Sequence, residues 1–216
     1  MKNYQHIIWD WNGTLLDDGW LFVDIMNIIL KKRNMNPISL EKYKKIFCFP
    51  VKEYYKKLGF DFNQISFEDC SIEFIKEYKK RIYEAKLYPQ VYEILDKLNQ
   101  KGIKNSILSA QNQTLLNILL KFYKIYDQFE HRIGLDNYYA NSKIENGIHL
   151  ISLLNIDPKS ILMIGDTSHD YDVAQILKID CCLISQGHYS KERLITTGTR
   201  VLKNLEEIAC FLKLTI

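Results

Sequence analysis

Apolar and polar positions follow two different patterns along this chain. In the second half, the pattern predicts strands at 105–110, 160–166 and 180–185, and helices at 90–100, 112–123, about 143–155, 172–178 and 204–213. Strands that alternate with helices at these intervals are typical of parallel βαβ units. We therefore predict an α/β fold with a Rossmann-like parallel sheet at its core.

The first part of the chain has one strand and then only helices. HIIWD, residues 6–10, predicts a short buried strand with Asp10 at its C-terminal end. The spacing then predicts helices at 19–33, 39–47, 50–58 and 66–85, with no strand signal from 18 to 86. We therefore predict two domains, which are an α/β core made of 1–17 and 87–216 and a helical insert at 18–86.

The composition is that of a globular protein with a substantial core, because 47% of the residues are apolar and 25% are charged. No apolar run is long enough to span a bilayer, and the N-terminus lacks the features of a signal peptide. We therefore expect a cytoplasmic protein that does not bind membranes. The five cysteines form no CxxC pair, so we expect reduced, mostly buried thiols rather than disulfides or a zinc site.

Charge is unevenly distributed along the chain. The net charge is +3, but residues 31–86 carry fourteen Lys and Arg against eight Asp and Glu. This basic block could bind nucleic acid, attract a small anion, or form a solvated helical surface, and the last is the commonest case. The spacing of its aromatic residues fits core packing better than base stacking. We therefore expect no nucleic-acid partner.

Polar side chains stand where three predicted strands end. Asp10, Ser109 and Asp166 occupy these positions, and Asp170 follows one helical turn after Asp166. Ligands of open parallel sheets bind at the carboxyl ends of the strands. Three carboxylates gathered there repel one another, and a divalent cation resolves the conflict. An all-oxygen ligand set favours Mg²⁺ over zinc, and Lys143, at the start of a helix, could neutralise further negative charge.

Such a set of groups suits phosphoryl transfer, in which the protein mainly positions groups and compensates charge. Each residue also has a simpler interpretation. An aspartate after a strand is often a helix cap, Ser109 could cap the helix at 112–123, and Lys143 could be a surface lysine. The functional interpretation is favoured because all of them fall on one edge of one predicted sheet.

Together these motifs resemble the haloacid dehalogenase-like (HAD) superfamily of phosphatases. The family pattern DxDGT reads DWNGT at 10–14, the strand-ending Ser is Ser109 in ILSA, the Lys is Lys143 in YANSK, and GDxxxD is GDTSHD at 165–170. The helical insert resembles the C1 cap of the family. The segments LYPQVYEILDKL and GDTSHDYDVA are similar to the phosphoglycolate phosphatase-like branch.

The resemblance implies a Mg²⁺-dependent hydrolysis of a small anionic phosphorylated metabolite. Asp10 would be the nucleophile that becomes an aspartyl-phosphate, and also a metal ligand. Asn12 would give its backbone carbonyl to the metal. Ser109 and the amide of Ala110 would hold the phosphoryl oxygens.

The remaining motifs supply charge compensation and the rest of the metal site. Lys143 would offset charge on Asp10 and on the transferring group. Asp166 would bind Mg²⁺, and Asp170 would support it directly or through water. The cap would close over the leaving group and select the substrate. Either a monomer or a homodimer is compatible with this sequence.

Asn12 departs from the family pattern, in which an aspartic acid protonates the leaving oxygen and then activates water. An amide can do neither, and acid–base help is worth ~10²–10⁴-fold in rate. Four interpretations remain open. The enzyme could be slow and selective for acyl or aryl phosphates, His169 or His188 could supply the proton, the chain could be an impaired phosphate-metabolite binding or regulatory protein, or Asn12 could deamidate beside Gly13. A dehalogenase is disfavoured, and a mutase or phosphotransferase would also need an acid at position 12.

Overall fold

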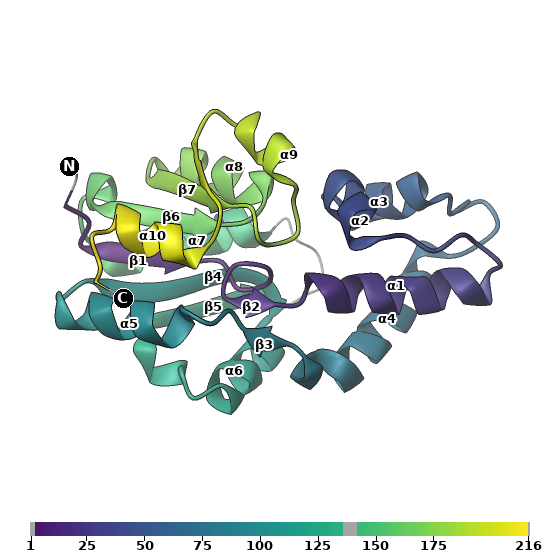
Figure 1. Ribbon diagram of the computed structural model, residues 1–216, viewed down its shortest axis with the longest axis horizontal. Coiled ribbons are helices and arrows are strands. Elements are labelled where there is room, and N and C mark those ends of the chain that lie inside the picture. Colours follow the sequence, from purple (N-terminus) through teal and green to yellow (C-terminus); the bar gives the residue numbers. More distant parts are fainter. Residues whose placement is uncertain (1–2, 136–141, 216) are drawn as a thin grey trace.

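A six-stranded parallel sheet lies at the centre of the larger part of the molecule (Figure 1). The computed structural model describes residues 3–135 and 142–215. The strand order is β5-β4-β1-β6-β7-β8. The strands are β1 (His6–Trp9), β4 (Lys104–Asn112), β5 (His131–Leu135), β6 (Ile161–Gly165), β7 (Asp180–Ile184) and β8 (Arg200–Leu202), and every neighbouring pair is parallel. The prediction of a Rossmann-like α/β fold is confirmed.

Helices cover both faces of this sheet. The helices are α5 (Val91–Gln100), α6 (Gln113–Phe122), α7 (Ser142–Leu154), α8 (Ser168–Leu177), α9 (Lys191–Ile195) and α10 (Leu205–Phe211). Successive side chains of a strand point to opposite faces. In β1, Ile7 and Trp9 pack in the cluster that contains α5, α6 and α10, whereas Ile8 packs in the cluster formed with α7 and α8.

Four helices form the insert, which lies beyond one end of the sheet (Figure 1). They are α1 (Gly19–Lys32), α2 (Leu40–Ile46), α3 (Val51–Leu58) and α4 (Phe67–Arg81). The chain leaves and re-enters the core through two short antiparallel strands, β2 (Leu16–Asp17) and β3 (Lys86–Leu87). We keep the name cap for residues 18–86. The exact boundary between core and cap stays a prediction. Strand β3 begins at Lys86, the last residue that we assign to the cap.

Helix termini in the cap follow the capping signals of the sequence. The Ser66 hydroxyl accepts a hydrogen bond from the backbone N–H of Asp69 at 3.2 Å, and so caps α4. Ser39 caps α2 in the same way through Lys42. These caps satisfy backbone donors that have no partner within the helix.

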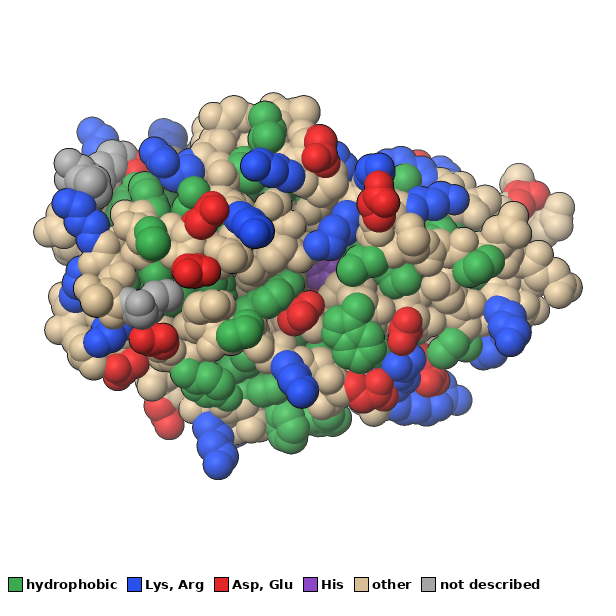
Figure 2. Space-filling model, viewed as in Figure 1, with side chains coloured by type: hydrophobic (Ala, Val, Ile, Leu, Met, Phe, Trp, Pro, Cys, Tyr) green, Lys and Arg blue, Asp and Glu red, His purple; other side chains and the backbone are tan. Residues whose placement is uncertain are grey.

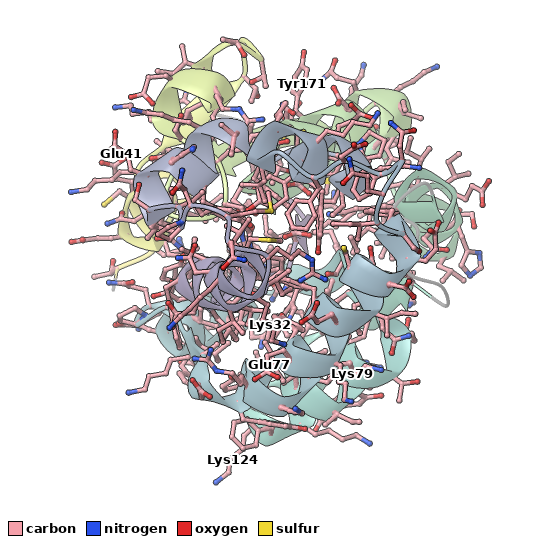
Figure 3. The ribbon with its side chains drawn as sticks, turned by 90° about the vertical axis from the view of Figure 1, so that its right-hand side faces the viewer. Lys32, Glu41, Glu77, Lys79, Lys124 and Tyr171 are labelled. Carbon is pink, nitrogen blue, oxygen red and sulfur yellow. The ribbon has the colours of Figure 1, made fainter. Side chains whose placement is uncertain are left out.

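The aromatic side chains of the basic block pack inside the cap, as predicted. Tyr43, Phe47, Tyr54 and Tyr55 are all buried. Many basic side chains pair instead with acids on the surface, among them Lys32–Glu73, Lys45–Glu41, Lys56–Glu53 and Lys80–Glu77. Figure 2 shows acidic and basic side chains next to one another over this end of the molecule, and Figure 3 shows Lys32, Glu77 and Lys79 on its outer side. These pairs fit a solvated helical surface.

Several elements lie where the sequence pattern predicts none. They are β2, β3, β5, β8 and α9, together with the short 3₁₀ helices at Tyr126–Gln128 and Pro158–Ser160. The cysteines form no disulfide, as predicted, but only Cys70 and Cys182 are buried, so "mostly buried" was wrong. Within the described ranges, every helix is too short or too polar to cross a lipid bilayer.

Candidate active site

The strand order brings the predicted site residues to one edge of the sheet. β1 lies between β4 and β6, so Asp10, directly after β1, lies between Ser109 of β4 and Asp166, directly after β6. The backbone N–H of Asp10 donates to the carbonyl of Ile164 at 2.9 Å, which fixes the two strand ends side by side. Residues that are far apart in sequence therefore share one site.

Three carboxylates form the centre of this site. Oxygens of Asp10, Asp166 and Asp170 lie within 4.8 Å of one another, and all three side chains are buried. Asp170 is held by the first turn of α8, where its Oδ2 accepts hydrogen bonds from the backbone N–H groups of Asp166 and Thr167. A Cβ on Gly165 would lie 2.3 Å from Cγ of Asp170, so only glycine permits this approach.

Asp170 therefore has two roles, since one oxygen caps α8 and the other faces Lys143. The Nζ of Lys143 lies 2.6 Å from Oδ1 of Asp10 and 2.6 Å from Oδ1 of Asp170. The lysine comes from the first turn of α7 and its side chain is only 2% exposed. The interpretation of Lys143 as a surface lysine was wrong. The part of its motif that precedes Ser142 lies outside the described residues.

Burial and charge act in opposite directions on these groups. Burial raises the pKa of Asp10 above its usual range, although Lys143 acts against the rise. Burial also raises the pKa of Asp166. For Asp170, burial opposes Lys143, but the lysine prevails and the pKa of the carboxyl is lowered. One lysine does not neutralise three acids, so the ionised cluster needs a further positive charge.

A divalent cation fits this need. Three carboxylates offer the hard oxygen ligands that Mg²⁺ prefers, at separations that a single ion can bridge. The cluster is therefore compatible with a divalent metal held by Asp10, Asp166 and Asp170. Asn12, predicted to add its backbone carbonyl, lies two residues after Asp10 in the same loop.

Ser109 lies where the pairing of β4 with β5 becomes irregular, between Leu108 and Asn112. Its hydroxyl accepts a hydrogen bond from the backbone N–H of Gln111 at 3.0 Å. Asn112, not Ser109, caps α6, so the alternative role of Ser109 as a helix cap was wrong. Ala110, its neighbour, is half-buried. The phosphate-binding roles of Ser109 and Ala110 stay predictions.

The side chain of Asn12 contacts two residues that the sequence did not single out. Its Nδ2 donates to Oδ2 of Asp18 at 2.6 Å and to the hydroxyl of Tyr78 at 2.8 Å. The Tyr78 hydroxyl in turn donates to Oδ2 of Asp18 at 2.9 Å. Oδ1 of Asp18 accepts the backbone N–H of Gly13, which has a φ of +76°. Asp18 is fully buried at the start of α1, and Tyr78 belongs to α4.

The two histidines considered as proton donors occupy different environments. His188 is buried, with Nε2 at 3.2 Å from Oδ1 of Asp18 and Nδ1 at 2.7 Å from the hydroxyl of Tyr43. Its backbone N–H donates to Oδ2 of Asp166 at 2.5 Å. Burial alone would lower the pKa of His188, but the Asp18 carboxylate raises it above the ordinary value. The ring of His169 packs against the ring of Phe49. The ring of His188 thus faces Asp18 and Tyr43.

The cap docks on the core beside this site. The Nζ of Lys44 donates to the carbonyl of Gln186, and the backbone N–H of Ser190 donates to the carbonyl of Lys44. The guanidinium of Arg193 donates to the carbonyls of Lys44 and Phe47 at the end of α2. The cap therefore contacts the core beside the site in this structure.

Comparisons with known proteins agree with this geometry. The family model described as "Haloacid dehalogenase-like hydrolase" matches residues 7–184. The chain is 25% identical over 171 residues to pyrophosphatase PpaX of Anoxybacillus flavithermus, covering 78% of this chain and 77% of that protein. It is 23% identical over 195 residues to phosphoglycolate phosphatase of Psychrobacter arcticus, covering 85% and 84%.

A solved structure shows the same fold. Protein tyrosine kinase A of Mycobacterium tuberculosis superposes with a TM-score of 0.82 at 22% identity, covering 98% of this chain and 99% of that one. The family model spans most of the chain, and both sequence relatives carry phosphatase names. The resemblance inferred from the motifs is thereby confirmed, including its phosphoglycolate phosphatase-like branch. The chain belongs to the haloacid dehalogenase-like hydrolases and is an enzyme of their phosphatase type.

Proposed function

We propose that this enzyme hydrolyses a small phosphomonoester through covalent catalysis by Asp10. The observation that carries the proposal is the buried contact of Asp10 with Lys143 at 2.6 Å, beside Asp166 and Asp170. A carboxylate is one of the few side chains that can accept a phosphoryl group. Lys143 would keep Asp10 ionised against the effect of its burial, so that it can attack phosphorus.

The reaction would proceed in two displacements. In the first, an oxygen of Asp10 bonds to phosphorus, the bond to the leaving oxygen breaks, and that oxygen takes a proton from water. In the second, water displaces Asp10 and releases phosphate. Ser109 and the amide of Ala110 would hold the phosphoryl oxygens. Mg²⁺, held by Asp10, Asp166, Asp170 and the carbonyl of Asn12, would when bound offset negative charge and orient the phosphoryl group.

The leaving group of the preferred substrate follows from Asn12. Its amide cannot protonate a departing alkoxide, so esters with good leaving groups should react best. Acyl and aryl phosphates have such leaving groups. The names of the relatives add pyrophosphate and phosphoglycolate as substrates to test.

The proposal is tested by phosphate release from p-nitrophenyl phosphate, acetyl phosphate, pyrophosphate and phosphoglycolate, with Mg²⁺ or with EDTA. We expect hydrolysis only with the metal, and a loss of ~10³-fold or more for Asp10→Asn. Asp17→Asn, which changes a half-buried aspartate of β2, is the matched control and should retain activity.

A binding or regulatory protein without turnover is the competing function, because Asn12 lacks a titratable proton. It would be supported if wild type and Asp10→Asn were equally inert with every substrate while phosphate esters still raised the melting temperature of the wild type. That result would reject the proposed hydrolysis.

A further inference from the structure

The hydrogen bonds of Asn12 fix the orientation of its amide. Oδ2 of Asp18 accepts from Asn12 at 2.6 Å and from the Tyr78 hydroxyl, and its Oδ1 accepts the backbone N–H of Gly13, so both oxygens act as acceptors. The amino group of Asn12, rather than its carbonyl, must therefore face Asp18. The second N–H of the same amino group donates to the Tyr78 hydroxyl at 2.8 Å. Both donors of the amide are engaged.

Tyr78 completes this arrangement from the cap. Its hydroxyl donates to Asp18 at 2.9 Å and accepts from Asn12 and from Nε2 of Gln111 at 3.3 Å. One proton and two lone pairs are thus all used. Gln111 lies two residues after Ser109, so the Tyr78 hydroxyl joins the loop of Asp10, the end of β4 and the cap.

An amide held by its amino group offers its carbonyl oxygen to a ligand. In GTPases a side-chain amide orients the attacking water without removing its proton. We propose that Asn12 orients the water that hydrolyses the aspartyl-phosphate, and that Asp18 and Tyr78 are positioning residues that hold its amide. This inference rests on the proposed function, because it concerns the second displacement.

The atoms of this step balance without a base at position 12. The water oxygen bonds to phosphorus as the bond between phosphorus and Asp10 breaks, and its electron pair returns to the Asp10 carboxylate. One water proton stays on the attacking oxygen, and the other passes to a phosphoryl oxygen. Oδ1 of Asn12 only accepts a hydrogen bond from the water during its approach.

The test follows the phosphoenzyme rather than overall turnover. Enzyme with Mg²⁺ is labelled with radioactive acetyl phosphate, and formation and decay of the labelled protein are followed by acid quench. We expect Tyr78→Phe to slow decay by about 3–10-fold, the effect of one hydrogen bond, while formation changes little. Asn12→Ala, which removes the carbonyl oxygen, should slow decay at least as much.

Tyr54→Phe is the matched control. It also removes a buried hydroxyl from the aromatic interior of the cap, but this hydroxyl has no hydrogen-bond partner within the described residues. The phosphoenzyme of Tyr54→Phe should decay like the wild type. An NMR readout is independent of activity, since the side-chain amide protons of Asn12 should exchange faster with solvent in Tyr78→Phe than in wild type or Tyr54→Phe.

Each outcome has a distinct meaning. If the wild type forms a phosphoenzyme but Tyr78→Phe decays at the wild-type rate, or if formation and decay slow equally, the role of Tyr78 is overturned and the proposed function stands. If the wild type forms no phosphoenzyme at all, the proposed function fails, and the role of Asn12 fails with it.

Discussion

At the scale of single residues, Asn12 and Asp18 form a complementary pair. The amide donates where the carboxylate accepts, at 2.6 Å in a part-buried site. An aspartate at position 12 would place a second carboxylate against Asp18, and like charges at such a distance destabilise each other. The amide at position 12 is therefore matched to its neighbour, and the departure from the family pattern has a structural counterpart at position 18.

We expect Asn12→Asp to lower the free energy of unfolding by about 1–3 kcal/mol, because it places a half-buried carboxylate against the buried carboxylate of Asp18. The exchange variant Asn12→Asp with Asp18→Asn restores one donor and one acceptor and should recover most of the loss. Urea denaturation of the wild type, both single variants and the exchange variant measures this coupling.

The exchange variant also tests the chemistry at position 12. It carries an acid there, so its rate should rise most with poor leaving groups such as alkyl phosphates. Additive effects of the two substitutions on stability would contradict the pairing. No gain in rate with alkyl phosphates would show that another group already supplies the proton.

At the scale of elements, the end of α2 docks on the segment that leads into α9. Arg193 contributes a charged donor to two carbonyls, those of Lys44 and Phe47, and its guanidinium lies 3.5 Å from the ring centroid of Tyr189. Hydrogen bonds from a charged group are stronger than those between neutral groups. This contact therefore holds the end of α2 against the core.

We expect Arg193→Ala to lower the free energy of local opening of residues 43–47 by about 1–3 kcal/mol, because the carbonyls at the end of α2 lose their charged donor. Hydrogen exchange of the backbone amides of this segment measures the effect. Arg200→Ala removes a guanidinium that stacks on Phe211 instead, and should leave exchange in α2 unchanged. Equal protection in all three proteins would contradict the docking role of Arg193.

Local sequence patterns indicate some of these elements and not others. The long apolar patterns predicted the cap helices and β1, β4, β6 and β7, since each buries a periodic face. β5 and β8 are edge strands of three to five residues, and β5 contains polar residues and a glycine. Their positions depend on pairing with a neighbour, which a local pattern does not encode.

The residues of the site were also predictable only in part. Asp10 and Asp166 were found because they follow recognisable strands, Ser109 because it lies near the end of one, and Lys143 through its motif. Tyr78 was missed because it is one of many aromatic residues in the cap, and its contact with Asn12 spans 66 positions of sequence. Asp18 is recognisable in the sequence as an acid close to the DWNGT motif, but the sequence does not indicate its contact with Tyr78.

At the scale of the whole molecule, the two edges of the sheet differ in chemistry. The carboxyl edge gathers acids, whereas His6 starts β1 at the opposite edge. Its Nε2 lies 2.8 Å from the hydroxyl of Ser106 in β4, and it is buried. Burial, assisted by His131 and Lys104, lowers the pKa of His6 to about 4 from an ordinary value of 6.5.

This shift makes the stability of the whole fold depend on pH. The unfolded chain takes up a proton as the pH falls through about 6.5, but the folded chain does so only near pH 4, so the free energy of unfolding falls between these values. The part due to His6 should reach about 2 kcal/mol at pH 5 relative to pH 7.

Urea denaturation at pH 7 and pH 5 checks this expectation. The difference in stability between the two pH values should shrink in His6→Gln, whereas His149→Gln, which changes an exposed histidine, should match the wild type. An unchanged difference in His6→Gln would show that His6 is not the responsible group.

A single residue, His188, contacts both the carboxylate cluster and the cap. Its backbone N–H bonds to Asp166, and its ring lies between Asp18 and the cap residue Tyr43. Thermodynamic linkage is reciprocal. If a cation at the cluster shifts His188 and so alters how readily the cap opens, then opening of the cap must alter the affinity for the cation by the same factor. The affinity for the cation and the equilibrium between open and closed cap would then both depend on one coupling free energy.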